Sequence, residues 1–222
     1  MNVMPSLRPI LSSALNLAHR PAGKVRFQRA LNNRPDANCL EFGAWRSRRE
    51  DWIVTDVSWR CPNFLDVSKP WPVGNNRFDF VFSDNVIEHL RLDQARYAFR
   101  ESFRVLRPGG RIRFVTPDIG ALVDVYRSPA DMSRDLAEEL VSDGYMIEHP
   151  VDLLRFVFQD DGHSEGYLWD RQSVATELSA AGFLDIEFCL PGNSRFEQLR
   201  DIDSRIVTPL ARSMLAVEAS KP

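Results

Sequence analysis

The sequence has few cysteines and no long apolar run. Cys39, Cys61 and Cys189 are the three cysteines in 222 residues, and they lie far apart without the spacing of metal ligands. A sparse and odd number is typical of reduced thiols, so we expect a cytoplasmic protein. No stretch approaches the roughly eighteen uninterrupted apolar residues that a membrane-spanning helix needs. The first residues also lack the pattern of a signal peptide, and we expect none.

Two phosphate-binding loops are missing as well. Neither the G-x-G-x-x-G fingerprint of dinucleotide-binding folds nor the G-x-x-x-x-G-K-[ST] loop occurs anywhere in the chain. In both loops, backbone N–H groups hold phosphate oxygens. Their absence disfavours a nicotinamide-dependent oxidoreductase and an enzyme that hydrolyses nucleoside triphosphates.

Acidic residues are missing from residues 1–35, although the net charge of the whole chain is −3. The basic residues of this segment are Arg8, Arg20, Lys24, Arg26, Arg29 and Arg34. A basic arm on an acidic body can bind an anionic surface or pack against its own body. We favour packing, because the charges are too sparse for a polybasic tract. We expect no nucleic-acid partner, since no stripe of alternating basic and aromatic residues is present.

Apolar residues recur at helical spacing from Leu7 to Ala18. Pro21 and Gly23 are expected to end this helix. The helix is predicted to lie across the main domain, and contact with a membrane surface or another protein stays open as an alternative. We therefore divide the chain into an N-terminal basic amphipathic arm at 1–36 and one domain at 37–222. A homodimer also stays open.

Strand and helix patterns alternate along the rest of the chain. The predicted strands are 37–42, 52–55, 78–82, 111–115, 184–190 and 213–219, and the predicted helices are 91–106, 119–127, 132–142 and 171–181. Asp170 is suited to cap the last helix, and Gly182 follows its end. The segment 107–110 (RPGG) is predicted as a turn. Such alternation predicts a mostly parallel sheet with helices on both faces.

Acidic residues follow the predicted strands. They are Glu41, Asp56, Asp66, Asp84 and Asp118. In an open α/β sheet, ligands bind beyond the carboxyl ends of the strands, so these side chains would converge on one edge. A carboxylate accepts hydrogen bonds from ribose hydroxyls and repels a pyrophosphate. The pattern therefore favours a nucleoside over a phosphate as the ligand.

Three consecutive segments resemble the class I methyltransferases that depend on S-adenosylmethionine (SAM). They are 78–90 (FDFVFSDNVIEHL), 103–110 (FRVLRPGG) and 111–118 (RIRFVTPD), within a resemblance that covers about residues 37–219. A narrower resemblance is to a bacterial subgroup of predicted methyltransferases with a shortened front end, in which a glycine loop runs directly into a Trp-containing strand. Here Gly43 precedes Trp52 and Asp56 at that spacing. The implied fold is a Rossmann-like, doubly wound, mostly parallel sheet with an antiparallel C-terminal strand.

The resemblance implies SAM as the cofactor and eight residues that contact it. These residues are Glu41, Gly43, Ala44, Asp56, Asp66, Val67, Ser83 and Asn85. The loop 41–44 would line the methionine end, Asp56 would take the ribose hydroxyls, and 66–67 would meet the adenine. Ser83 and Asn85 would form the wall beside the sulfonium.

The glycine loop departs from the family pattern. Trp45 stands where family members usually have a second glycine, and Ala44 where they have a cysteine or a similar small residue. The Trp45 ring would fold outward, stack near the adenosine or plug the site. Arg46, Arg48 and Arg49 make the loop unusually basic for a cationic cofactor. The alternative to an enzyme is therefore a methyltransferase-like protein that has lost catalysis and acts as a binding or scaffolding partner.

A methyltransferase mainly holds its acceptor in line with the methyl group of an activated donor. A general base is needed only where the acceptor keeps its proton, as a hydroxyl does. His89, Asp84 and His163 are our candidates for that base, because His89 and Asp84 follow the third strand and His163 lies in a glycine-containing loop. We expect a small-molecule or saccharide-type acceptor, by analogy with the family only. We expect no metal.

Overall fold

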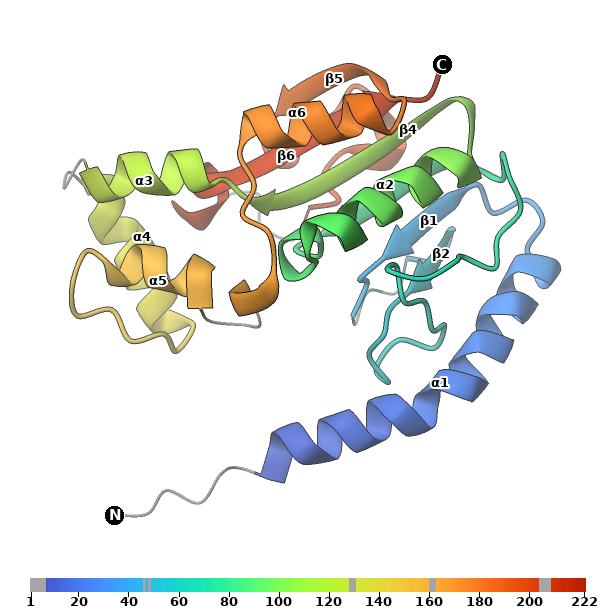
Figure 1. Cartoon of the computed structure of the whole chain (residues 1–222), viewed down its shortest axis with the longest axis horizontal. Helices are drawn as coiled ribbons and strands as arrows, with labels where there is room; N and C mark the ends of the chain where they lie inside the picture. The colour runs from blue at the N-terminus through green and yellow to red at the C-terminus, as the bar shows by residue number, and fades with distance from the viewer. Residues whose placement is uncertain (1–6, 46, 48, 128–130, 160–162, 204–208) are drawn as a thin grey trace.

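The computed structural model describes residues 7–45, 47, 49–127, 131–159, 163–203 and 209–222. Its sheet has the strand order β2-β1-β3-β4-β6-β5 (Figure 1). The strands are β1 (Cys39–Phe42), β2 (Trp52–Thr55), β3 (Phe78–Asp84), β4 (Leu106–Pro117), β5 (Leu184–Cys189) and β6 (Met214–Ser220). The first four strands pair in parallel, and β6 is antiparallel to both of its neighbours. The predicted Rossmann-like fold with an antiparallel C-terminal strand is confirmed.

The chain reverses its direction of winding beside β1. It passes from β1 to β2 on one side and then crosses to β3 on the other, with Leu40 opposite Ile53 in β2 and Val81 in β3. Every residue of β1 and β2 is buried, as expected for parallel strands covered on both faces, although β2 lies at the edge of the sheet. Ligands of open α/β sheets bind at such a switch point. The fold therefore places the candidate site beyond the carboxyl ends of β1 and β3.

Helices pack on the sheet, and three further helices form a lobe beside it. Helices α2 (Leu92–Val105) and α6 (Arg171–Ala180) lie side by side over one face of the sheet (Figure 1). Helices α3 (Ile119–Arg127), α4 (Asp131–Ser142) and α5 (Asp152–Gln159) form a lobe whose apolar core also includes residues of β4 and β6. Short 3-10 helices are η1 (Ile87–His89), η2 (His163–Glu165), η3 (Glu197–Leu199) and η4 (Pro209–Ser213). Helix α5 was not predicted.

The predicted N-terminal cap of α6 and the predicted glycine after its C-terminal end are confirmed. The Asp170 carboxylate accepts a hydrogen bond from the backbone N–H of Ser173 at 2.7 Å. Gly182 follows the helix with a φ of +100°, in the left-handed region that favours glycine. Local side-chain chemistry therefore sets both ends of this helix.

Helix α1 (Leu7–Asn33) corrects the predicted end at Pro21 and Gly23, because both residues lie inside the helix. The helix bends along its length (Figure 1), as a proline within a helix commonly causes. Phe27, beyond the proline, is fully buried in the same core as Leu40 of β1. This tertiary packing keeps the chain helical past the local stop signals. Ahead of Pro21, Leu15 is 44% exposed, and the side chains of residues 7–12 lie outside the described part.

The RPGG segment is also corrected, because residues 107–110 belong to β4 rather than to a separate turn. Gly109 donates a backbone hydrogen bond to the Lys221 carbonyl at 2.8 Å, and Lys221 donates one to the Gly110 carbonyl at 2.9 Å. The segment forms an irregularity in the β3–β4 pairing, and Gly109 has a φ of +78°. The residue after β6 thus holds this segment in the sheet through backbone hydrogen bonds.

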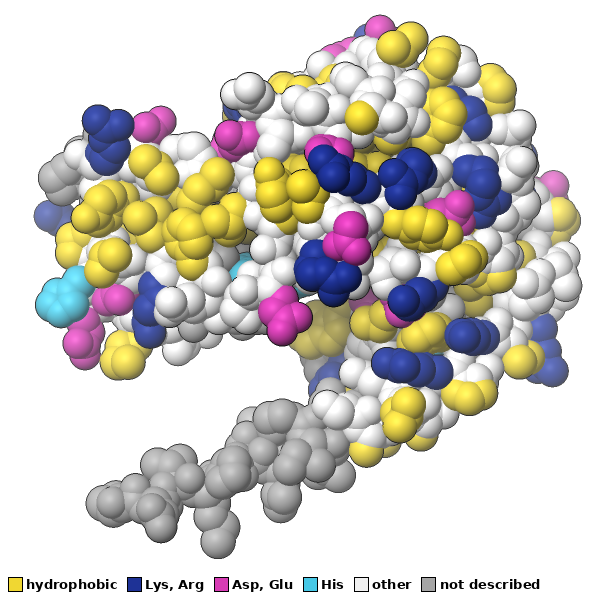
Figure 2. Space-filling view, in the orientation of Figure 1, with side chains coloured by type: hydrophobic (Ala, Val, Ile, Leu, Met, Phe, Trp, Pro, Cys, Tyr) yellow, Lys and Arg dark blue, Asp and Glu magenta, His cyan; other side chains and the backbone are white. Residues whose placement is uncertain are grey.

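Basic and acidic side chains are interspersed on the face that Figure 2 shows, with no single basic patch there. None of the helices that the structure describes is long and apolar enough to cross a membrane.

Candidate active site

A cavity of about 780 Å³ opens beyond the carboxyl ends of β1 and β3. Ligand pockets of this kind typically measure about 300–1,000 Å³. Seven of the eight predicted cofactor residues line it: Glu41, Gly43, Ala44, Asp56, Asp66, Val67 and Asn85. Asp84 and His89, two of the three candidate bases, line it as well. The cavity lies where the winding of the sheet predicts a ligand.

Ser83 is the predicted residue that is not among the described lining residues. Its side chain is 1% exposed, whereas Phe82 and Asp84 on either side line the cavity. Successive side chains of a strand point to opposite faces, so Ser83 faces away from its neighbours. Asn85 follows with a φ of +52°, and its N–H donates to the Val115 carbonyl at 3.0 Å. The structure thus turns the chain sharply where β3 ends at the cavity.

Asp118 does not join the other strand-end acids. Its carboxylate accepts a hydrogen bond from the N–H of Gly120 at 3.0 Å, at the start of α3. The four remaining acids line the cavity as expected. The helix that begins directly after β4 therefore uses this carboxylate as a cap.

The glycine loop has the close approach that the family pattern suggests. Gly43 has a φ of +72°, and a Cβ added there would lie 2.1 Å from Cγ2 of Val86. Only glycine fits both the backbone conformation and this contact. Ala44 follows, and its N–H donates to the Thr55 carbonyl at 3.0 Å, which joins the loop to β2.

Trp45 keeps a left-handed backbone, with a φ of +42°. Its side chain is 54% exposed, and the Arg60 guanidinium lies 5.9 Å from the ring centroid. The ring lines the cavity without filling it, since about 780 Å³ remain open beside it. Of the three arrangements considered from the sequence, the plugged site is not the one seen. Arg46 and Arg48 lie outside the described residues.

Two aspartates fix the far side of the cavity. Asp56 accepts backbone hydrogen bonds from Trp45 and Ser58, both at 2.7 Å. Asp66 accepts from the backbone N–H of Ser68 at 3.1 Å and from its hydroxyl at 2.6 Å. Asp66 is therefore oriented by its own loop and Asp56 by its own loop and the glycine loop, and both carboxylates keep lone pairs for a ligand.

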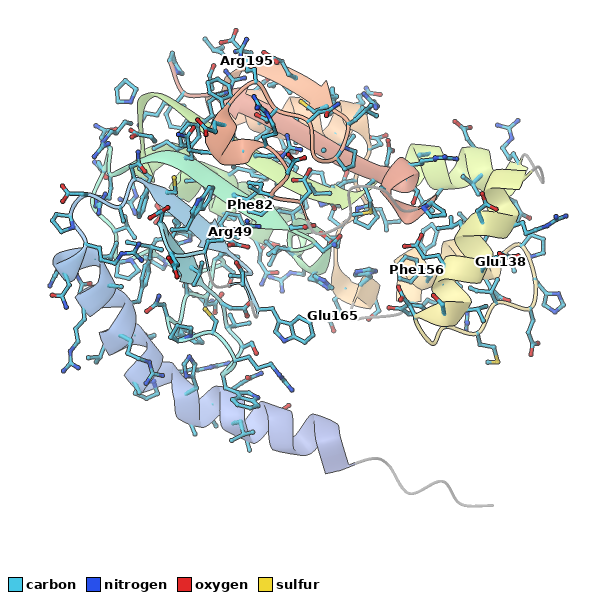
Figure 3. All side chains as sticks on the ribbon, turned by 180° about the vertical axis from the view of Figure 1, so that it is seen from behind. Arg49, Phe82, Glu138, Phe156, Glu165 and Arg195 are labelled. Atoms are coloured by element: carbon cyan, nitrogen blue, oxygen red, sulfur yellow. The ribbon has the colours of Figure 1, made fainter. Side chains whose placement is uncertain are left out.

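Glu41 lies at the base of the cavity in an ion pair that the sequence did not predict. Arg49 Nε lies 3.0 Å from Glu41 Oε2, and the Ser47 hydroxyl donates to the same oxygen at 2.8 Å. Burial raises the pKa of Glu41, and Arg49 and Ser47 partly oppose this. The Arg49 guanidinium lies 5.5 Å from the centroid of the Phe82 ring; both residues are labelled in Figure 3. It also donates to the Ile202 carbonyl at 2.6 Å.

Ile202 lines the cavity from a loop near the end of the chain. A buried ion-pair network holds that loop. Arg113 pairs with Asp203 through two hydrogen bonds and with Glu218 at 2.7 Å, and all three side chains are almost fully buried. Burial lowers the pKa of Arg113, but its bonds to the two carboxylates outweigh this and raise the pKa overall. No sequence motif marks this loop.

The two candidate histidines lie together, although they are far apart in the sequence. The ring centroids of His89 and His163 are 4.6 Å apart. His89 is exposed and lines the cavity, whereas His163 is 7% exposed and lies behind it. Asp84 reaches the same cavity from β3. The structure therefore brings two of the three candidate bases, Asp84 and His89, to the cavity and places His163 against His89.

Residues 36–114 match the family model described as a methyltransferase domain. No curated protein sequence matches the chain. A SAM-dependent methyltransferase of Thermotoga maritima is similar in structure, with a TM-score of 0.51, 12% identity, and coverage of 95% of this chain and 94% of that one.

Two further structures are similar at lower scores. Phosphoethanolamine N-methyltransferase 2 of Haemonchus contortus, in complex with SAM, has a TM-score of 0.49 and 16% identity, covering 83% of this chain and 48% of that one. The chain thus spans about half of that protein's length. A SAM-dependent methyltransferase of Archaeoglobus fulgidus has a TM-score of 0.47 and 14% identity, covering 89% and 92%. The chain therefore has the Rossmann-like fold seen in SAM-dependent methyltransferases, and its residues 36–114 match the methyltransferase domain family.

Proposed function

We propose that this protein is a SAM-dependent methyltransferase. The observation that carries the proposal is the cavity at the β1–β3 switch point, lined by seven of the eight residues that the sequence assigned to the cofactor. The match of residues 36–114 to the methyltransferase domain family supports it independently.

The donor groups of the cavity fit the parts of SAM. Asp56 has the position and lone pairs to accept hydrogen bonds from the ribose hydroxyls. The Arg49–Glu41 pair offers opposite charges to the carboxylate and ammonium of the methionine part. Val67 and Leu65 offer an apolar surface to the adenine. Gly43 has no Cβ, so the cofactor would be able to approach the backbone closely at this residue.

When bound, SAM supplies an already activated methyl group. The protein has to align an acceptor with that methyl group and exclude water. Asp84 and His89 line the end of the cavity where an acceptor would enter, and either can hold the proton of an acceptor hydroxyl. His163 lies behind His89 and would act through it.

The acceptor class in this proposal is a small molecule or a saccharide. Its support is the family resemblance and the cavity volume of about 780 Å³, which suits a compact acceptor beside the cofactor. The shortened loop between β1 and β2 supports the bacterial subgroup, and the reduced cysteines support a cytoplasmic location.

The test is calorimetric titration of the full chain with SAM and S-adenosylhomocysteine. We expect micromolar binding, and we expect Asp56→Asn to weaken it by about ten- to a hundredfold, as loss of a hydrogen bond to a charged group does. Asp79→Asn is the matched control, because Asp79 lies in β3 and pairs with Arg107 outside the cavity.

The opposite result would identify the alternative function. No binding by the natural chain, with binding gained in Trp45→Gly, would mean that the protein has lost its cofactor and acts as a binding or scaffolding partner. No binding by either chain would reject SAM altogether.

A further inference from the structure

Three metal-ligating side chains meet beside the cavity. Glu88 and His89 belong to η1, and His163 belongs to η2. One ligand atom of each lies within 4.8 Å of the others. Glu88 is 3% exposed and His163 is 7% exposed, whereas His89 is open to the cavity.

The two short helices are held together by backbone contacts. A Cβ added to Gly166 would lie 1.6 Å from the Glu88 carbonyl oxygen, so the two backbone segments are in direct contact at this glycine. Tyr167 donates a backbone hydrogen bond to the Leu90 carbonyl at 2.9 Å, just beyond η1. The approach of His163 to the Glu88–His89 pair is therefore fixed by the fold.

Neighbouring side chains support two of the three ligands from behind. The Thr116 hydroxyl donates to Oε2 of Glu88 at 3.1 Å, which orients the carboxylate. The ring centroid of Phe156, labelled in Figure 3, lies 6.2 Å from that of His163. Metal ligands in proteins commonly have such an outer layer of hydrogen bonds and apolar contacts.

The ligand types select a class of metal. Two imidazoles and one carboxylate form the three-ligand set of catalytic zinc sites, which leave a fourth position open. Magnesium and calcium prefer oxygen ligands alone. The three ligand atoms all lie within 4.8 Å of one another, close enough for one zinc ion with ligands at about 2.0–2.2 Å after small side-chain adjustments.

We propose that Glu88, His89 and His163 bind a divalent transition metal of the zinc class at the acceptor end of the cavity. His89 lines the cavity, so a metal held by these ligands would lie close enough to polarise an oxygen of the acceptor. His89 would then be a ligand, and Asp84, which also lines the cavity, would hold the acceptor proton. The metal site rests on its three ligands alone. Its role toward an acceptor rests on the proposed methyl transfer.

The test uses the full chain, freed of metal with a chelator and then titrated with Co²⁺. Cobalt bound by histidine nitrogen and carboxylate gives visible absorption, and competition with Zn²⁺ gives the zinc affinity. We expect one equivalent to bind, and His89→Ala and Glu88→Gln to weaken binding by more than the roughly ten- to a hundredfold typical of outer-layer changes. His149→Ala is the matched control and should bind as the natural chain does, because His149 lies outside the cluster.

Several outcomes would overturn the proposal. Absence of cobalt absorption and of zinc competition would leave the cluster as a hydrogen-bonded network without metal. Metal binding that survives both His89→Ala and His163→Ala would place the metal elsewhere. His89→Ala separates loss of a metal ligand from unfolding, because replacing an exposed histidine should leave the apolar core folded. Thermal unfolding of the variant would verify this. SAM titration of the same samples separates failure of the metal site from failure of the proposed function.

Discussion

The backbone N–H of Trp45 donates a hydrogen bond to the Asp56 carboxylate at 2.7 Å. The residue that departs from the glycine pattern is thus held by the residue proposed to bind ribose. The bond needs only the backbone of residue 45 in its left-handed conformation, with a φ of +42°. A glycine there would make the same bond, so the substitution leaves this part of the loop intact.

Trp45→Gly should therefore change SAM affinity by less than about tenfold, which corresponds to ~1.4 kcal/mol. The ring is half exposed and does not fill the cavity. Calorimetry of both proteins measures the effect, with Trp59→Gly as the control at an exposed tryptophan outside the cavity lining. A gain of a hundredfold or more would show that the ring obstructs the cofactor.

Gly43→Ala should destabilise the loop and abolish SAM binding. A left-handed backbone costs a residue with a side chain about 1–2 kcal/mol, and the contact with Val86 adds to this. Urea unfolding and SAM titration measure both effects. The double variant with Val86→Ala should recover part of the stability, because it removes the clash and leaves the strain.

Gly74→Ala is the matched control for that substitution. Nothing lies within 4 Å of a Cβ at Gly74, and its φ is not in the left-handed region. Its stability should equal or slightly exceed that of the natural chain. Equal losses in Gly43→Ala and Gly74→Ala would contradict the proposed close approach.

Glu41 should make the stability of the protein fall as the pH rises. Its pKa in the folded state is raised above the ordinary 4.5, chiefly by burial. The folded chain thus keeps a proton that the unfolded chain has released, and the free energy of unfolding decreases with pH across the interval between the two pKa values.

Glu41→Gln should remove this component, so the variant gains stability relative to the natural chain as the pH rises above the ordinary pKa of 4.5. Urea midpoints at a series of pH values measure the difference. Glu50→Gln, at an exposed position in the same loop, should run parallel to the natural chain. A natural chain that gains stability relative to Glu41→Gln with rising pH would reverse the sign and reject the raised pKa.

Arg113→Met should unfold the loop that carries Ile202 and destabilise the protein by about 3–5 kcal/mol, because Asp203 and Glu218 would remain buried without their cation. Arg107→Met removes a surface pair with Asp79 and should cost less than about 1 kcal/mol. Urea unfolding of both variants measures the contrast. Similar losses would mean that the buried network does not anchor the loop.

Local sequence patterns were enough to predict the strands and the approximate positions of their carboxyl ends. The apolar patterns of β1, β2 and β3 are local, and Asp56, Asp66 and Asp84 follow from their positions after or between strands. Because parallel strands bring their carboxyl ends to one edge, the sequence was sufficient to gather most of the cavity lining.

The contacts between segments that are far apart in the sequence depend on the tertiary structure. Ile202 reaches Glu41 only through Arg49, and His163 reaches His89 only because η2 packs on η1. The continuation of α1 past Pro21 depends on burial of Phe27. Local periodicity records the conformation of neighbouring residues, whereas these contacts depend on burial and pairing between segments that only the folded chain brings together.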